Sequence, residues 1–415
     1  MTERSAESDS RTPTTLRLAR EIGPELQQLR RRLHRIPEIA NQLPLTQQVV
    51  LEALDGLDLQ ITRGRALTSV TAVLRGTADP ADGVRQVVLL RGDMDALPVT
   101  EEVDVPYVSE HVGAMHACGH DLHMAGLVGA ARVLHAMRDQ LPGDVVFMFQ
   151  PGEEGPGGAE PMLQEGLLDV AGRRVDASYA LHVYSNDMPL GQWASRPGTT
   201  GAAADEVKVR VIGQGGHGSA PHRAQDPIPI LCEMVLALQT MVTRGFDVFD
   251  PVVVTVGRIA GGTKENIIPD DAEFEATVRS LSHANREKIQ ADITRVVEGI
   301  AAAHGVKVEV DYKLGYPVTV NDDTEYARAK QAVVDLFGAE RFTELPNPEL
   351  GSEDMAFVME LVPSAYFNVG ACPVEDYESF PDNHSQRAAF DDTVLPDCTA
   401  WLAEMAVRRL AATAP

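Results

Sequence analysis

Hydrophobic residues follow two different spacings along the first 200 residues. Apolar side chains recur at helical spacing over residues 15–34, which predicts an amphipathic helix, and a second helix is expected over residues 46–54. Short runs rich in β-branched and apolar residues predict strands at residues 69–75, 86–91, 144–150 and 177–183. Alternating helices and strands of this kind indicate an α/β layered sheet.

The pattern changes near residue 201. The next predicted elements are, in order, a strand at 206–212, a helix at 227–243, strands at 251–259 and 271–280, a helix at 284–304 and a strand at 306–313. This β-α-β-β-α-β order predicts a small ferredoxin-like domain inserted into the larger one. We therefore expect a disordered tail at residues 1–14, a discontinuous mixed-sheet α/β domain at 15–200 and 314–415, and an inserted domain at 201–313.

Composition excludes several classes of function. The formal net charge of -25 disfavours nucleic acid and anionic membrane surfaces as partners. The four cysteines are far apart and form no CxxC motif, which favours a reducing compartment over a disulfide scaffold. The N-terminus lacks a signal-like apolar region, and no apolar run approaches the ~20 residues of a membrane span. We expect a soluble cytoplasmic protein.

The densest chemistry lies in the motif MHACGHDLH at residues 115–123, with three histidines and one cysteine. Cys118 and His120 are two residues apart, so in an extended loop both side chains point to the same side. A thiolate and an imidazole placed in this way form half of a transition-metal site. Asp121 is predicted to be the N-cap of the helix that follows. The alternative is a loop whose histidines only bind main-chain carbonyls.

Three further candidate ligands follow strands or lie in a polar loop: Glu154, His182 and His384. Together with Cys118 and His120 they supply one thiolate, three imidazoles and one carboxylate. This set suits two divalent ions ~3.5–4 Å apart with the thiolate shared between them. For His182 a structural role is the alternative.

Two other carboxylates have candidate roles in catalysis. Glu153 precedes a candidate ligand, and it could take a proton from an attacking water and deliver it to a leaving amine; the alternative is an exposed acidic turn. Asp95, in the motif RGDMDALP, is expected to fix a ligand histidine through its carboxylate, whereas Asp93 could be structural.

These motifs carry a family resemblance. LRGDMDALPVTEE, MHACGHDLH, QPGEEGPGG, GQGGHGSAPH, ENIIP and GSEDMAF resemble, in order and spacing, the amidohydrolase branch of the aminoacylase and carboxypeptidase G-type metallopeptidases. The branch includes hippurate hydrolases, auxin-conjugate hydrolases and N-acyl-amino-acid amidohydrolases. The similarity extends from about residue 33 to the C-terminal helix.

The resemblance implies Cys118, His120, Glu154, His182 and His384 as metal ligands and Glu153 as general base. It also implies that the inserted domain is a satellite domain that mediates a homodimer or a dimer of dimers. His217 would polarise the substrate carbonyl, in its own or the partner's site, and Asn266 and Arg279 would contact the substrate carboxylate. The alternative to these roles is a purely structural one: a tight glycine turn at His217, a loop amide at Asn266 and a surface arginine at Arg279. One departure is the His384-Ser385-Gln386-Arg387 loop, where relatives carry a proline soon after the histidine.

The predicted function is therefore hydrolysis of a small N-acyl amino acid with two divalent ions, the choice among Zn, Mn, Co and Ni remaining open. One alternative is a dipeptidase or carboxypeptidase with the same site. Others are a cysteine hydrolase with Cys118 as nucleophile and His120 as base, and a non-catalytic scaffold, although the chain retains every ligand and the base.

Overall fold

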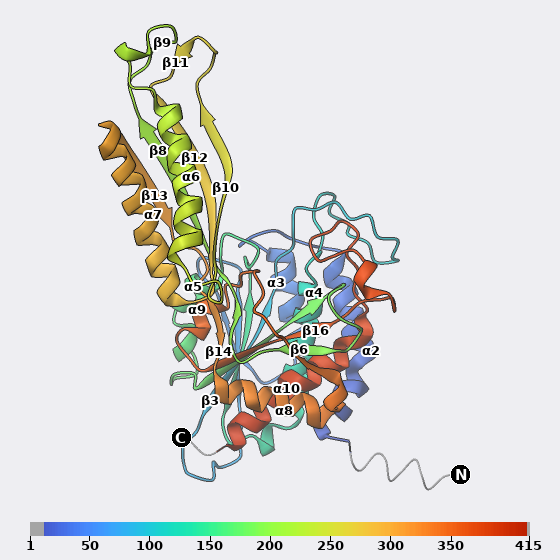
Figure 1. The fold of residues 1–415 in the computed structure, drawn as a ribbon. Helices are drawn as coiled ribbons and strands as arrows, with labels where there is room; N and C mark the ends of the chain where they lie inside the picture. Colours follow the sequence, from blue (N-terminus) through green and yellow to red (C-terminus); the bar gives the residue numbers. More distant parts are fainter. Residues whose placement is uncertain (1–11, 413–415) are drawn as a thin grey trace. The chain divides into compact units, whose positions relative to one another are not determined.

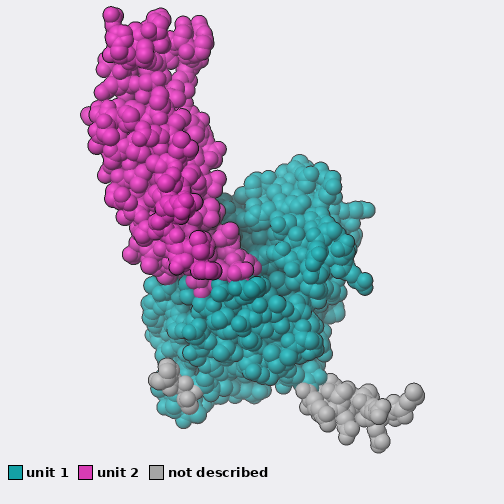
Figure 2. Space-filling model, viewed as in Figure 1, with its two compact units in different colours: residues 1–198, 320–346, 357–415 teal, residues 199–319, 347–356 magenta. Residues whose placement is uncertain are grey.

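The computed structural model describes residues 12–412, and the chain forms two compact units (Figure 2). Unit 1 comprises Met1–Gly198, Val320–Pro346 and Phe357–Pro415, and unit 2 comprises Thr199–Thr319 and Asn347–Ala356. The predicted disordered segment, residues 1–14, lies outside the described residues as far as residue 11, and Thr14 already begins the first helix.

Unit 1 is built on an eight-stranded mixed sheet with the order β1-β2-β4-β3-β5-β16-β6-β15. Its strands are β1 (Gln60–Arg63), β2 (Val70–Arg75), β3 (Val87–Asp93), β4 (Asp144–Gln150), β5 (Ala177–Tyr184), β6 (Trp193–Ser195), β15 (Phe342–Glu344) and β16 (Ser364–Gly370). The neighbours β4, β3, β5 and β16 run parallel, whereas β1, β2 and β4 pair antiparallel. The expected mixed α/β fold is confirmed. Because β4, β3, β5 and β16 run parallel, the carboxyl ends of these four strands lie at one edge of the sheet.

The helices of unit 1 pack on this sheet and on one another. They are α2 (Thr14–His34), α3 (Pro44–Leu54), α4 (His120–Ala136), α5 (Ala159–Gln164), α8 (Asp323–Phe337), α9 (Ala356–Met359, which begins in unit 2) and α10 (Leu395–Ala411). The apolar side chains that predicted the first helix by their spacing are buried in α2, among them Leu16, Leu26 and Leu33. Helix α4 contacts both α2 and α10. A Cβ at Gly129 would lie 2.4 Å from the Thr399 hydroxyl, so glycine allows this close approach.

Unit 2 contains a four-stranded antiparallel sheet with the order β10-β12-β8-β13. Its elements are β8 (Ala203–Ile212), β9 (Gly216–His217), α6 (Pro227–Gly245), β10 (Val252–Gly261), β11 (Ile267–Ile268), β12 (Asp271–Ser280), α7 (His283–His304) and β13 (Lys307–Lys313). Alternate residues of β8 and β12 are buried in a core shared with α6 and α7. The short strands β9 and β11 form a ribbon at one end of the unit (Figure 1). Strands β7 (Gly198–Gly201) and β14 (Thr319–Asn321) lie where the chain enters and leaves the unit.

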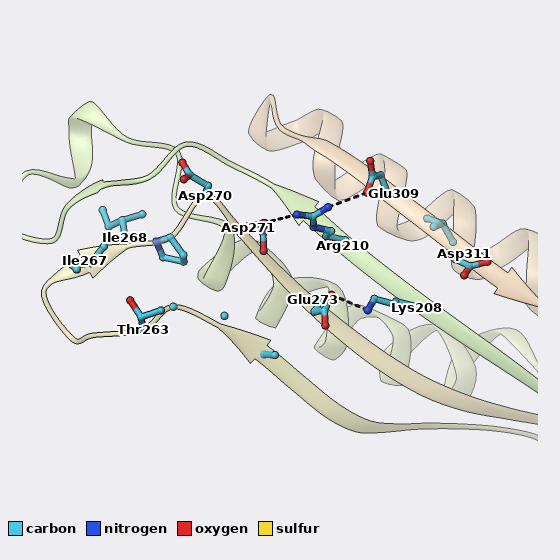
Figure 3. Close-up of a pocket in the computed structure, with 15 residues that line it drawn as sticks. Lys208, Arg210, Thr263, Ile267, Ile268, Asp270, Asp271, Glu273, Glu309 and Asp311 are labelled. Atoms are coloured by element: carbon cyan, nitrogen blue, oxygen red, sulfur yellow. Dashed lines mark hydrogen bonds and ion pairs between the residues drawn. The ribbon is translucent and has the colours of Figure 1, made fainter.

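The other face of this sheet is charged and hollowed (Figure 3). Lys208 lies 2.9 Å from Glu273, and Arg210 lies 2.6 Å from Asp271, each pair joining neighbouring strands. The same arginine lies 3.7 Å from Glu309 on β13. Because these opposite charges compensate one another, the face has the character of a solvated surface.

Helix α6 is, among the described helices, the one that is long and apolar enough to cross a membrane by length and composition. Length and composition alone are weak grounds for a membrane span. Part of its apolar character has a local cause, because Ile230, Leu231, Met234 and Leu238 are buried in the core of unit 2.

Candidate metal centre and active site

The candidate site lies at the carboxyl edge of the parallel strands in unit 1. Strand β3 ends two residues before Asp95, β4 ends three residues before Glu153, and β5 carries His182 near its own end. Since β3 pairs in parallel with both β4 and β5, these three chain segments meet at one edge. Open α/β sheets commonly bind ligands at such an edge.

The Cys118 loop runs directly into helix α4. The helix begins at His120 and its N-cap is Gly119, so the prediction of Asp121 as the N-cap is wrong. Gly119 has a φ of 80°, which glycine adopts without strain, and a Cβ there would lie 2.3 Å from a methyl group of Val183. The Asp121 carboxylate instead receives an ion pair from Arg30 at 2.7 Å.

A first group of donor atoms consists of Cys118, His120 and His182, whose ligand atoms lie within 4.8 Å of one another. The Cys118 Sγ is 3.3 Å from the His182 Nε2. The His120 Nδ1 pairs with the main-chain carbonyl of Asp95 at 2.9 Å. Because a carbonyl only accepts, Nδ1 carries a proton, and Nε2, which is buried without a hydrogen-bond partner, is the nitrogen that can face a metal ion.

A second group consists of Cys118, Glu154 and His384, again within 4.8 Å. The His384 Nε2 is 3.3 Å from the Cys118 Sγ and 3.2 Å from the Glu154 Oε1. His384 has a φ of 69°, unusual for a residue other than glycine. Its main-chain N–H donates to the carbonyl of Ala117 at 2.9 Å, which holds the unusual His384 loop against the Cys118 loop.

The two groups share one atom, the Cys118 Sγ, and so bring together all five residues that the sequence suggested as ligands. Glu154 Oε1 is buried, and its ion-pair partner is the His384 Nε2 at 3.2 Å. Burial raises the pKa of the Cys118 thiol to about 12, so a thiolate here requires a nearby positive charge. A shared thiolate with imidazole and carboxylate donors fits two divalent transition-metal ions.

The protonation states of the protein groups also differ across the site. Burial lowers the pKa of His182 well below its usual value, which keeps this imidazole neutral. Burial opposes the charged form of Glu154, but the hydrogen bond to His384 and the charge of His120 outweigh it and lower the pKa of Glu154. A neutral imidazole and an ionised carboxylate are the forms that bind metals.

Glu153 lies beside these groups, buried, with its carboxylate within 4.8 Å of the donor atoms of His120 and Glu154. The Asp95 carboxylate accepts the main-chain N–H groups of Glu153 at 3.0 Å and Glu154 at 3.1 Å. Asp95 therefore fixes His120 through its main-chain carbonyl, and its carboxylate positions the glutamate loop. The Asp95 carboxylate, which was predicted to fix a ligand histidine, also lies 3.6 Å from the same nitrogen of His120, Nδ1.

Sequence reasoning gave no role to two other residues near the site. Asn383 donates to the main-chain carbonyl of Val183 at 3.0 Å and accepts from the main-chain N–H of Ser185 at 2.9 Å, which holds the loop of the adjacent His384. His123 hydrogen-bonds Asp93 at 2.6 Å. The sequence could have pointed to His123 through its place in the MHACGHDLH motif, three residues after the candidate ligand His120.

The three remaining candidates lie in unit 2. His217 is in the β9 strand, Asn266 directly precedes β11, and the main-chain carbonyl of Asn266 accepts from Gly218 at 3.0 Å. The β9–β11 ribbon therefore brings His217 and Asn266 together. Arg279 lies near the opposite end of β12 and donates to the Ser352 hydroxyl at 3.0 Å.

Comparison with known proteins agrees with a hydrolase site of this kind. Residues 89–408 match peptidase family M20/M25/M40. The chain is 36% identical to thermostable carboxypeptidase 1 of Saccharolobus solfataricus, over 91% of this chain and 93% of that protein. It is 34% identical to an IAA-amino acid hydrolase of Arabidopsis thaliana, over 94% and 86% of the two chains. A Bacillus subtilis structure described as a dinuclear metal-binding peptidase of the M20 family superposes with a TM-score of 0.80 at 30% identity, covering 94% of this chain and 99% of that one.

The fold and the site thus define an enzyme that hydrolyses amide bonds. The chain belongs to peptidase family M20/M25/M40.

Proposed function

We propose that this enzyme hydrolyses the amide bond of small N-acyl amino acids, releasing a carboxylic acid and an amino acid. The observation that carries the proposal is the pair of three-donor groups that share the Cys118 Sγ, with Glu153 beside them. Cys118, His120 and His182 would hold one divalent ion, and Cys118, Glu154 and His384 the other. When bound, two such ions supply Lewis-acid polarisation of a carbonyl and lower the pKa of water.

The chain's own groups account for the proton transfers. The Glu153 carboxylate accepts a proton as water attacks the acyl carbon, and it delivers that proton to the nitrogen as the C–N bond breaks. Asp95 contributes by fixing the main chain at Glu153 and Glu154. General acid–base catalysis of this kind contributes roughly 10²–10⁴-fold to a rate.

His217 is suited to donate a hydrogen bond to the developing oxyanion. Its Nδ1 accepts the main-chain N–H of Ser219 at 3.1 Å, and the Ser219 hydroxyl lies 2.8 Å away. Because this nitrogen accepts, the proton of the neutral imidazole resides on Nε2, which becomes the available donor. Donors aimed at developing charge are worth about 10²–10³-fold in kcat.

The spacing within unit 2 supports a dimer in which one chain completes the other's site. His217 and Asn266 lie beyond the Asp271 end of β12, whereas Arg279 lies near its Ser280 end. From Asp271 to Arg279 the strand extends about 27 Å, at a rise of about 3.4 Å per residue. This length exceeds a small N-acyl amino acid, so the three residues act on one substrate only if they come from two chains. We assign His217 and Asn266 to one chain of the dimer and Arg279 to the other chain at each substrate.

The β-α-β-β-α-β unit is then the ferredoxin-like satellite domain that mediates this homodimer. A substrate of the acyl-amino acid type is favoured by the IAA-amino acid hydrolase among the relatives, while the carboxypeptidase relative supports a dipeptidase or carboxypeptidase as the second candidate. The four cysteines are all free, which favours the cytoplasm. The mixed donor set is compatible with Zn, Mn, Co or Ni.

The experiment is a hydrolysis panel of acetyl, benzoyl and indole-acetyl amino acids beside dipeptides, with the wild-type protein and Glu153→Ala. The proposal expects cleavage of N-acyl amino acids that stops with a chelator, returns with added metal and is absent in the variant. Cleavage of dipeptides alone would favour the second candidate. Activity that is indifferent to the chelator and lost on thiol alkylation would favour the Cys118 nucleophile instead, a reading that the raised pKa of the thiol opposes.

A further inference from the structure

His123 is the third histidine of the MHACGHDLH motif, and it lies at the base of the first donor group. It follows His120 by three residues on helix α4, so the two side chains share a face of the helix. It is 2% exposed. Its ring stacks on His120 with centroids 5.4 Å apart and meets the ring of His182 edge-on at 4.9 Å. His123 thus contacts both imidazoles of this group.

Both ring nitrogens of His123 have protein partners. The main-chain N–H of Val183 donates to Nε2 at 2.9 Å, so Nε2 must accept and the ring proton resides on Nδ1. Nδ1 donates to the Asp93 carboxylate at 2.6 Å. Although the donor atoms of Asp93, His120 and His123 lie close enough to hold an ion, these hydrogen bonds occupy both nitrogens. His123 therefore positions the neighbouring candidate ligands and does not itself bind a metal ion.

The Asp93 carboxylate is also fixed from its other side. Arg91, on the same strand, lies 2.5 Å from it, and the Arg91 Nε donates to the side chain of Gln150 on β4 at 3.0 Å. The side chains of Arg91, Asp93 and Gln150 are buried. A buried charge pair with complete hydrogen bonding is rigid, so Asp93 gives His123 a fixed anchor.

Strand β5 is paired with β16 as far as Tyr184, including at His182, but its pairing with β3 on the other side stops short of His182. The last paired residues are Arg91 and Ala180, two positions before the candidate ligand. The hydrogen bond from Val183 to His123 continues the attachment of β5 on that side, directly after His182. The second donor group is held by other contacts. The main-chain N–H of Glu154 donates to the Asp95 carboxylate, and the main-chain N–H of His384 donates to the carbonyl of Ala117.

We propose that His123 is a positioning residue that sets the affinity of one metal position, the one formed by Cys118, His120 and His182, and leaves the other largely unchanged. The inference rests on the proposed dinuclear function. Outer partners of metal ligands commonly affect metal affinity 10- to 100-fold, and we expect a loss of this size at one of two positions.

Two variants separate the two contacts of His123. In His123→Asn the amide nitrogen replaces Nδ1 and keeps the Asp93 contact, while the Val183 contact is lost. In His123→Gln the longer side chain places its oxygen near the Nε2 position and keeps the Val183 contact. His135→Gln, on the same helix but in its last turn, is the matched control. The readout is zinc titration by calorimetry, with bound zinc counted per chain.

We expect the wild type and the control to bind two zinc ions per chain with unchanged affinity. Both His123 variants should bind one zinc ion as tightly as the wild type and the other about 10- to 100-fold more weakly. Equal weakening of both positions, or no weakening, would overturn the positioning role. A wild type that binds no zinc would overturn the proposed function as well, which distinguishes the two failures.

A crystal structure of the zinc-loaded wild type provides the test if the variants do not fold. We expect the His123 Nε2 to accept the Val183 N–H in that structure and not to bind zinc. A zinc–His123 bond would contradict the proposal.

Discussion

The Nε2 atom of His120 and the Oε1 atom of Glu154 lie 3.9 Å apart, and both are buried. The His120 nitrogen has no hydrogen-bond partner, whereas the Glu154 oxygen forms an ion pair with the His384 Nε2 at 3.2 Å. They belong to different donor groups, and the Cys118 Sγ is common to both groups. Buried polar atoms without partners are costly to a folded protein. Bound cations would compensate them, so metal binding and stability are expected to be coupled.

Metal should therefore stabilise the fold. At a free zinc concentration 100 times the dissociation constant, one site adds about 2.7 kcal/mol to the free energy of unfolding. Denaturant unfolding with and without zinc measures this difference. An unfolding midpoint that does not depend on zinc would contradict a zinc site in this position.

The shared thiolate predicts an asymmetry among ligand variants. Cys118→Ala should lose both metal ions, whereas His182→Ala and His384→Ala should each lose the ion of their own group. Metal content per chain after gel filtration measures this. Cys232→Ala, at an exposed cysteine, serves as the control and should keep both ions. Two ions retained by Cys118→Ala would rule out the shared position.

Glu153→Gln removes the proton acceptor and keeps the size of the side chain. We expect kcat to fall by about 10²–10⁴-fold while metal content is unchanged, because the loss is in proton transfer. Glu160→Gln, an exposed glutamate of α5, should behave as the wild type. A variant that lowers metal content as much as kcat would make Glu153 a ligand and not a base.

Asp95→Asn tests how the glutamate loop is held. The carboxylate accepts two main-chain N–H groups, and the amide of asparagine has a single oxygen in its place. Loss of one buried acceptor should cost about 1–3 kcal/mol in the free energy of unfolding, together with a fall in kcat. Unfolding and steady-state kinetics on the same preparation measure both. An unchanged stability would mean that the contact does not hold the loop.

Stability should also depend on pH through His34 on α2. Its Nδ1 lies 2.8 Å from the Asp121 carboxylate and its Nε2 lies 3.0 Å from the Glu101 carboxylate. Burial and the nearby Arg30 lower the pKa of His34, but the contacts with Asp121 and Glu101 outweigh them and raise it. A pKa raised on folding gives stability that is complete below the unfolded value of about 6.5 and is lost as pH rises through the folded value.

His34→Gln removes this contribution. At pH 6 the variant should be about 3–5 kcal/mol less stable than the wild type, as for the loss of one member of a buried ion pair, and the difference should shrink in alkaline solution. Urea unfolding of both proteins across this pH range measures it. A difference that grows with pH would mean that His34 is neutral in the folded protein.

The sequence alone was sufficient for the local elements and for the candidate donors. Helical spacing predicted α2, because burial of one face imposes a period on the residues themselves. Short apolar and β-branched runs predicted β2, β3, β4 and β5. The motifs around Cys118, Glu154 and His384 similarly pointed to a metal site, because few other functions call for these residue types in such density.

The tertiary structure decided what depends on partners distant in sequence. The short strands β1, β6 and β15 were not predicted, since strands of three or four residues acquire their partners only in the folded sheet. Asp121 looked like an N-cap, but Arg30 and His34 engage its carboxylate. In the same way, the sharing of Cys118 between two donor groups and the support of β5 by His123 follow from contacts between segments that the chain brings together only on folding.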